Sequence, residues 1–278
     1  HELVGDLVVI GGNKLPRAKP KTNVDVSPFS EEVLDYYRPY GFTKLLHTSP
    51  KGCSPHAAVK LAMVKAVENA SFSPKDINFC VSALSIEFIN KFSLERLQRL
   101  KPCPLSVAIN GCDGIPYMER LPLKTSGGYG HPGPKRAHFM LMQPTDIHQV
   151  CYEANPDLVT EVEYILSQYR KGEEANPVFK ATFKDEPITL EKAAMNKVRI
   201  FTASPMAFSI VMRQYLMPII REFSGHNRLQ FEMAIGANAH GRDWDDITRH
   251  IVQHGENRCF AGDYKNFDKQ MPPELILA

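Results

Sequence analysis

The chain has 278 residues, of which 43% are hydrophobic and 23% are charged, and its formal net charge is +2 at pH 7. A chain of this length and composition can bury a substantial core, which excludes a disordered protein and favours one large or two modest domains. Its longest apolar runs fall far short of the roughly 20 residues that span a bilayer, and residues 1–10 lack the pattern of a signal peptide, so we expect no membrane insertion by this chain.

The first 100 residues change character along the chain. Residues 1–50 are rich in Pro, Gly and Lys and predict an extended strap. Pro55 follows Ser54 at the first position of a helix, and apolar residues at helical spacing carry that helix to about Ala70. The helical pattern returns over 84–100, whereas Pro and Gly break 101–133 into mostly loop and short strand.

Helices and strands are mixed in the remainder of the chain. The expected elements are a helix from Asn155-Pro156 to Lys171-Gly172, strands at 179–183 and 198–202, a helix from Ser204-Pro205 through Ile219, a helix from Asp243 to about Gly255 and a strand at 258–264. Pro218 is expected to kink or end the helix that contains it. This order predicts a mixed α+β fold without internal repeats.

The six cysteines are widely spread and include no Cys-x-x-Cys pair, which favours buried or incidental thiols in the cytosol over a disulfide framework. Charge is distributed unevenly. Eight Lys and Arg oppose four Asp and Glu over 180–228, whereas five oppose eight over 229–278. A basic stretch beside an acidic one suits a nucleotide with its metal ion, although an ordinary solvated surface explains the charge alone equally simply.

Two carboxylates, Asp263 and Asp268, flank the turn after the last expected strand. Magnesium accepts a few hard oxygen ligands and keeps positions open for phosphates, so Asp263 at a strand end is a suitable ligand. Asp268 could accept a hydrogen bond from a sugar hydroxyl. Taken alone, the pair is equally consistent with two turn-forming aspartates.

A second group is basic and consists of Lys184, Lys192, Lys197 and Arg199. Lys197 and Arg199 are two residues apart, so an extended chain would present both on one face, as a clamp on a triphosphate requires. Each cation by itself is also explained by an exposed hairpin.

Residues 125–133, Thr-Ser-Gly-Gly-Tyr-Gly-His-Pro-Gly, form a third feature, which we name the glycine loop. Small residues let backbone amides approach a phosphate chain, and the hydroxyls of Thr125 and Ser126 add donors. The Lys-Ser/Thr of a nucleotide P-loop is missing, which argues against a P-loop NTPase. Such a loop found alone would most often be a connector.

The order and content of these features resemble the RNA-dependent RNA polymerases of picorna-like positive-strand RNA viruses. The matching positions are Thr125-Ser126-x-Gly128-Tyr129, where the template enters the fingers; Lys184-Asp185-Glu186, Lys192 and Lys197-x-Arg199, the basic fingers motif; Gly236 and Trp244, upstream of the first palm motif; and Asp263-Tyr264-x-x-Phe267-Asp268, that motif itself. The resemblance covers roughly residues 110–272.

The resemblance implies a right-hand polymerase fold, truncated to the fingers and the start of the palm. Residues 1–50 would be an N-terminal strap with fingertips, 51–228 the fingers and 229–278 the start of the palm. The fingers would carry the glycine loop at 125–133 and the basic nucleotide-channel motif at 184–202.

The resemblance also implies roles for single residues. Asp263 would ligate magnesium, with manganese as the alternative ion, and Asp268 would recognise the ribose 2′-hydroxyl. Lys184, Lys192, Lys197 and Arg199 would line the nucleotide channel, while Thr125, Ser126 and Gly128 would guide the template backbone. Nucleotidyl transfer would then follow two-metal chemistry.

The expected partners are an RNA template and primer, nucleoside triphosphates and other viral replication proteins, in replication complexes of the host cell cytoplasm. Two positions depart from the family pattern. Ile188 stands where a further basic residue is usual, and Gly130-His131-Pro132 stands where a proline usually follows the Tyr at once.

The sequence contains no Gly-Asp-Asp, so we expect that this chain alone does not polymerise. The alternative function is a non-catalytic RNA- or phosphate-binding fragment. His250, His254 and Cys259 invite a zinc site, but no glutamate occupies the position that a zinc hydrolase needs, and a solvated helical pair is the simpler explanation.

Overall fold

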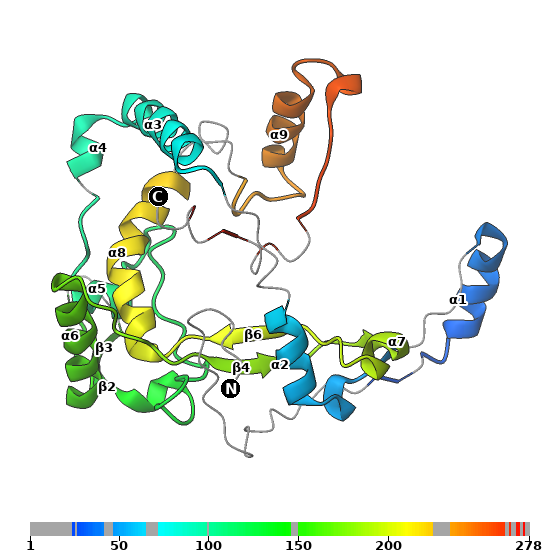
Figure 1. Ribbon diagram of the computed structural model, residues 1–278, viewed down its shortest axis with the longest axis horizontal. Helices are drawn as coiled ribbons and strands as arrows, with labels where there is room; N and C mark the ends of the chain where they lie inside the picture. The colour runs from blue at the N-terminus through cyan, green and yellow to red at the C-terminus, as the bar shows by residue number, and fades with distance from the viewer. Residues whose placement is uncertain are drawn as a thin grey trace. The chain divides into compact units, whose positions relative to one another are not determined.

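The structure is a computed structural model that describes residues 24–25, 27–41, 47–64, 72–98, 100–145, 150–224, 234–264, 267, 271–272 and 275. The chain divides into two compact units. Unit 1 comprises His1–Phe72, Lys180–Ala203 and Asn266–Leu277, and unit 2 comprises Ser73–Phe179, Ser204–Lys265 and Ala278. Both units combine helices with short antiparallel strand pairs, which confirms the mixed α+β fold (Figure 1).

The elements of unit 1 are α1 (Ser30–Tyr37), η1 (Arg38–Tyr40), β1 (His47–Thr48), η2 (Pro50–Gly52), α2 (Pro55–Val64), β4 (Lys180–Phe183), β5 (Ile188–Thr189), α7 (Leu190–Ala194) and β6 (Ile200–Ala203). Strand β4 pairs with β6, and β1 pairs with β5, both antiparallel. The small core beneath these pairs contains Cys53, Ala58, Ile188 and Val198. Helix α2 packs next to β6 (Figure 1).

The elements of unit 2 are α3 (Pro74–Lys91), α4 (Leu94–Gln98), α5 (Leu105–Asn110), η3 (Lys135–His138), β2 (Phe139–Met142), β3 (Cys151–Ala154), α6 (Pro156–Arg170), α8 (Met206–Ser224), α9 (Arg242–Val252) and η5 (Glu256–Arg258). Helices α6 and α8 lie side by side (Figure 1). Leu158 and Ile210 are fully buried in the core between them. Within the described ranges, no helix is both long and apolar enough to cross a bilayer.

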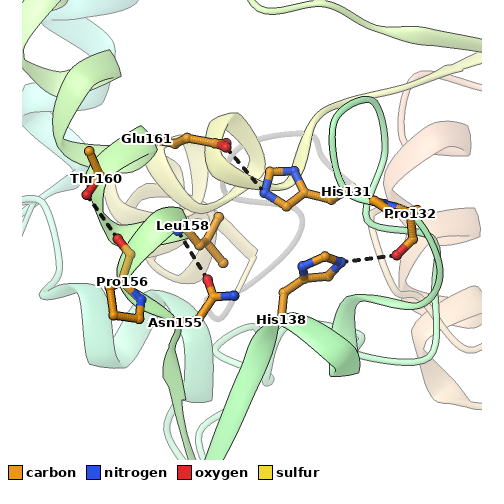
Figure 2. A network of polar contacts seen from close by, with 8 residues as sticks. All are labelled: His131, Pro132, His138, Asn155, Pro156, Leu158, Thr160 and Glu161. Carbon is orange, nitrogen blue, oxygen red and sulfur yellow. Dashed lines mark hydrogen bonds and ion pairs between the residues drawn. The ribbon is translucent and has the colours of Figure 1, made fainter.

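Local sequence signals placed most of these elements correctly. The helix expected from Asn155-Pro156 is α6, and the side chain of Asn155 accepts a hydrogen bond from Leu158 N at 3.1 Å (Figure 2). This is the contact of an N-cap, and Pro156 adds a first residue whose φ already suits a helix. Helix α2 and strands β4 and β6 likewise lie within two residues of the starts that the sequence predicts.

Pro218 does not end helix α8, which continues to Ser224. Proline has no N–H, so the carbonyl of Gln214, one turn earlier, loses its usual donor. Cys103 N donates to that carbonyl at 2.7 Å, and Gln214 Nε2 donates to Cys103 O at 3.3 Å. A tertiary contact therefore satisfies the group that Pro218 leaves unpaired.

Two expectations about secondary structure were wrong. The helix expected over 84–100 begins at Pro74, after Ser73, and stops at Lys91, where Phe92 turns extended and becomes buried. The extended strap of residues 1–50 contains helix α1, whose first turn carries Glu31 and Glu32, which suits the helix dipole. The stretch 101–133 is mostly loop, as expected, and contains the short helix α5.

The strand expected at 258–264 is also absent. Arg258 ends the short helix η5, and residues 259–264 are exposed without strand pairing. A strand is stabilised by hydrogen bonds to a neighbour, and within the described residues no segment pairs with this one. The segment has the apolar and aromatic residues of a strand, but within the described part of the chain no neighbouring strand pairs with it.

Candidate nucleotide and template sites

One pocket of unit 1 collects three of the basic side chains expected to meet a triphosphate. The pocket has a volume of about 220 Å³ and is lined by α2 on one side and by residues 186–199 on the other. Its polar and charged lining residues are His47, Glu186, Thr189, Lys192, Lys197 and Arg199. Lys184 does not line the pocket, but it forms an ion pair with Glu186, which does.

A short turn brings Lys192 and Lys197 together. The hydroxyl of Thr189 accepts a hydrogen bond from Lys192 N at 3.3 Å and caps helix α7. Lys197 N then donates to Lys192 O at 2.8 Å, and Asn196 between them has a positive φ of 52°. Asn196 Oδ1 also accepts from Ser54 N at 2.6 Å, which ties this turn to the start of α2. The four residues between the lysines therefore form a closed turn, and both side chains line one pocket.

The electrostatics of the pocket centre on Glu186. Its Oε2 lies 3.2 Å from Lys184 Nζ and 3.4 Å from Arg199 Nη1. The side chains of Lys184 and Arg199 are 45% and 72% exposed, so water screens both ion pairs and each contributes little to stability. Two cations thus share one carboxylate at the solvent edge of the pocket, where an anionic ligand could replace it.

The burial of Ile188 explains why this position does not carry the basic residue that is usual in the family pattern. Its side chain is 6% exposed and packs with Cys53, Ala58 and Val198 in the core of unit 1. The same burial raises the pKa of the Cys53 thiol, which keeps that group neutral. A cation at position 188 would have to be desolvated in this apolar setting. The pocket therefore has an apolar floor where a further basic residue is usual in the family.

His47 is a pocket residue that the sequence analysis missed. It lies on β1, within the segment expected to be an extended strap, and pairs with Thr189 in the register of β1 and β5. No local pattern marks it, because the pairing joins residues that are far apart along the chain. Only the strand pairing brings His47 to the pocket.

In unit 2 the glycine loop is the end of a narrow hairpin. Ser126 forms an isolated antiparallel bridge with Pro134, and Gly127 N donates to Gly133 O at 3.0 Å. Lys135 N donates to Thr125 O at 2.8 Å. These contacts fix both arms of the loop, so Thr125, Ser126 and Gly128 lie on an ordered segment and not on a loose connector.

Two glycines of the loop are required by close backbone contacts. A Cβ on Gly127 would lie 2.6 Å from His131 O, and a Cβ on Gly128 would lie 2.7 Å from Ser204 O. Gly128 also has a φ of +91°, a conformation that other residues rarely adopt. Gly128 thus lets the loop approach the start of α8, while Tyr129 next to it is exposed.

The second departure, Gly130-His131-Pro132, lies inside the loop, and Figure 2 shows His131 and Pro132. His131 is buried, and its Nε2 lies 3.5 Å from Glu161 Oε1 on α6. The ring of His138 meets the ring of His131 edge to face at 4.9 Å, and its Nε2 lies 3.2 Å from Pro132 O. The additional residues therefore pack the loop against helix α6.

The expected metal ligand Asp263 lies in unit 2 beyond η5 and is exposed. Asp268 lies outside the described residues. Among the residues that the structure does describe, no three His, Cys, Asp or Glu side chains come together closely enough to hold a metal ion. Asp263 thus offers one carboxylate, which suits magnesium only if further oxygen ligands come from elsewhere. Within the same residues, His250 and His254 belong to no such group of metal-binding side chains.

Comparison with known proteins bears on these sites. A family model described as viral RNA-dependent RNA polymerase matches residues 56–278. The replicase polyprotein of Cricket paralysis virus is 30% identical over 172 residues, which are 61% of this chain and 10% of that polyprotein. The RNA1 polyprotein of Satsuma dwarf virus is 29% identical over 283 residues, covering 95% of this chain and 13% of that polyprotein.

Among solved structures, the RNA-dependent RNA polymerase 3Dpol of a sicinivirus matches with a TM-score of 0.47 and 20% identity, over 63% of this chain and 35% of that one. The chain thus spans only a small part of the viral polyproteins that it matches. The family model nevertheless extends from the start of α2 to the last residue. Since that match covers well over half of the sequence, the chain belongs to the viral RNA-dependent RNA polymerase family.

Proposed function

We propose that this chain is the fingers and first palm segment of an enzyme that joins nucleoside triphosphates on an RNA template. One observation carries the proposal: Lys192, Lys197 and Arg199 line a single pocket. In this assignment residues 1–50 are the strap and fingertips, 51–228 the fingers and 229–278 the start of the palm.

The pocket of unit 1 suits a triphosphate because its cations lie at the solvent edge. Glu186 occupies Lys184 and Arg199 with one negative charge, whereas a triphosphate carries several. The ligand would therefore displace Glu186 and take over both cations, and the planar Arg199 could bind two phosphate oxygens at once. Lys192 would add a point charge from α7, and Lys197 would add one from the turn that follows it.

The glycine loop would guide the template strand. Its buried glycines hold it in one conformation, and Ser126 and Tyr129 on its surface are exposed to a ligand. Contacts from a hydroxyl and from backbone groups position a phosphate chain without reading its sequence, which is what template passage requires. Thr125, Ser126 and Gly128 are the residues assigned to this role.

Asp263 would hold one magnesium ion, or manganese, together with phosphate oxygens of the nucleotide, and Asp268 would bind the ribose 2′-hydroxyl. When bound, such ions would supply the charge stabilisation that two-metal chemistry gives to the primer 3′-hydroxyl and the departing pyrophosphate. The sequence contains no Gly-Asp-Asp to supply further ligands, so this chain is proposed to be inactive by itself. Its setting would be the host cytoplasm, in replication complexes with RNA and other viral proteins.

Isothermal titration calorimetry with nucleoside triphosphate and magnesium tests the pocket. Wild-type chain should bind, and Arg199→Met and Lys197→Met should each weaken binding about tenfold, since each removes a charged partner of a phosphate. Lys171→Met is the control, because Lys171 is exposed at the end of α6, on the other unit. Absence of binding by the wild-type chain would overturn the proposed nucleotide site.

A primer-extension assay tests the metal site. We expect no extension by this chain alone, and extension that Asp263→Ala abolishes would contradict that expectation. The second candidate function is a non-catalytic RNA- or phosphate-binding fragment, which is favoured because, among the described residues, Asp263 belongs to no group of three metal-binding side chains. The two functions differ in magnesium dependence: nucleotide binding that magnesium strengthens supports the polymerase, whereas RNA binding without any effect of magnesium on nucleotide binding supports the fragment.

A further inference from the structure

We infer that Lys135 is the positioning residue of the glycine loop: its ammonium group fixes Thr125, which leaves the hydroxyl of Ser126 as the side-chain donor to a phosphate of single-stranded RNA. This inference rests on the proposed function of the loop as the template guide. It adds a residue outside the loop and separates the roles of two neighbouring hydroxyls.

Lys135 is unusual among the lysines because it is only 9% exposed. Its Nζ donates to Thr125 Oγ1 at 2.7 Å and to Ser126 O at 2.9 Å. Both acceptors are neutral oxygens, and among the described residues no carboxylate forms an ion pair with it. Burial without a counter-ion lowers the pKa of Lys135.

A buried ammonium without a counter-ion is unfavourable, so its contacts must offset the loss of water. Here both contacts are to the first two residues of the glycine loop. The backbone of Lys135 adds a third, since Lys135 N donates to Thr125 O at 2.8 Å. One residue therefore holds the first arm of the loop through its main chain and its side chain together.

The hydrogen bonds distinguish the two hydroxyls of the loop. Thr125 Oγ1 donates its only hydrogen to Pro122 O at 2.7 Å and accepts from Lys135. It has no hydrogen left for a phosphate. Ser126 Oγ accepts from Gly128 N at 3.3 Å, and no group in the described part of the chain takes its hydrogen. Ser126 is exposed, so that hydrogen can be donated to an RNA phosphate.

Lys135 acts through this geometry and not by touching the phosphate. Its two hydrogen bonds direct the ammonium into the hairpin, and little of the side chain reaches the surface. A cation that contacts a phosphate releases counterions when RNA binds, and its removal lowers the salt dependence of binding. Removal of a positioning residue instead weakens binding at every salt concentration by the same factor.

The test measures binding of a short fluorescein-labelled oligouridylate by anisotropy over a series of KCl concentrations. We expect Lys135→Met and Ser126→Ala each to weaken binding about five- to tenfold, which is the effect of one typical hydrogen bond. The slope of log Kd against log[KCl] should stay that of the wild type in Lys135→Met. A slope reduced by about 0.7 would mean direct phosphate contact and would overturn the positioning role.

Substitutions of Thr125 provide the second readout. Thr125→Ser keeps the hydroxyl and should bind as the wild type does, whereas Thr125→Val should reproduce the loss in Lys135→Met. The double variant Lys135→Met with Thr125→Val should be no weaker than Lys135→Met alone, because both substitutions remove the hydrogen bond between Lys135 and Thr125. Additive losses, or wild-type affinity in Lys135→Met, would overturn the inference. Lys171→Met again serves as the control.

Amide hydrogen exchange separates this inference from the function on which it rests. In Lys135→Met, the amides of Gly127 and Lys135 should exchange faster, while the amide of Val162 in α6 keeps its protection. Unchanged exchange in the loop would overturn the role of Lys135 even if RNA binds. Absence of RNA binding by the wild type would overturn the template function, and exchange would still decide whether Lys135 holds the loop. If Lys135→Met also exposes α6, the Thr125→Val variant carries the test.

Discussion

The pocket of unit 1 and the glycine loop of unit 2 use positive charge in opposite ways. Arg199 and Lys184 lie at the surface, 72% and 45% exposed, and share Glu186. Lys135 is 9% exposed, and its ammonium group donates hydrogen bonds to neutral oxygens of the glycine loop. Exposed ion pairs contribute about 0–1 kcal/mol, so the pocket cations are available to a ligand at little cost to the fold. The buried cation of the loop is part of the architecture.

The residues that depart from the family pattern follow the same division. Ile188, in place of a cation, packs in the core of unit 1 and lines the pocket, and His131, in the segment that replaces an immediate proline, packs the loop against α6. Both side chains are buried. In each region the residue that departs from the pattern is therefore buried and packs inside its unit. The exposed residues that would meet the ligand keep the residue types of the family motif.

Ile188→Lys gives the largest expected effect and tests whether the pocket needs an apolar floor. The free energy of unfolding should fall by about 2–4 kcal/mol, because the apolar contacts are lost and an ammonium must be desolvated in the core. Urea denaturation measures this. The matched control is Leu190→Lys, which is exposed and should change stability by less than about 0.5 kcal/mol. Equal stability of the two variants would show that position 188 accommodates a cation.

Gly128→Ala tests how closely the glycine loop must approach the start of α8. The new Cβ would meet Ser204 O at 2.7 Å at a φ of +91°, so the loss should be about 1–3 kcal/mol. Gly130→Ala is the control, since its φ of +79° is similar but nothing lies within 4 Å of the added Cβ. A lower thermal midpoint in Gly128→Ala than in Gly130→Ala measures the cost of the close contact with Ser204 O. Identical midpoints would show that this contact does not affect stability.

The pH dependence of stability tests the buried cation. Burial lowers the pKa of Lys135 below its ordinary 10.5, so between the two values the unfolded chain binds the additional proton. Stability of the wild type relative to Lys135→Met should therefore rise with pH across that window, by about 1.4 kcal/mol for each unit of lowering. Denaturant titrations of both proteins at increasing pH measure the difference. A stability difference between the two proteins that does not change with pH would show that the ammonium group of Lys135 is solvated and not buried.

Glu186→Gln has the smallest expected effect and concerns the exposed cations. Removal of the carboxylate leaves Lys184 and Arg199 to the ligand, so triphosphate binding should tighten by up to about fivefold, with the gain shrinking at high salt. Calorimetric titration compares it with Glu191→Gln, an exposed carboxylate of helix α7 that does not line the pocket. Weaker binding in Glu186→Gln would mean that Glu186 orients the cations and does not compete with the ligand.

Sequence alone determined the features that depend on neighbours a few residues apart. The cap at Asn155 and the proline after it set the start of α6, and the spacing of Lys192, Lys197 and Arg199 marked the basic turn. The closely spaced glycines of 125–133 likewise marked a loop whose backbone must approach other groups. These signals are local, so no tertiary contact is needed to recognise them.

Only the tertiary structure decided which of these residues face a ligand and which support the site. Lys135 and Lys184 look alike in the sequence, yet the hairpin buries one, whereas the other ion-pairs at the surface. His47 reaches the pocket through pairing with a strand far along the chain, whereas residues 259–264 belong to no strand among the described segments despite a strand-like pattern. Burial and strand pairing depend on distant partners, and periodicity within a single segment does not encode those partners.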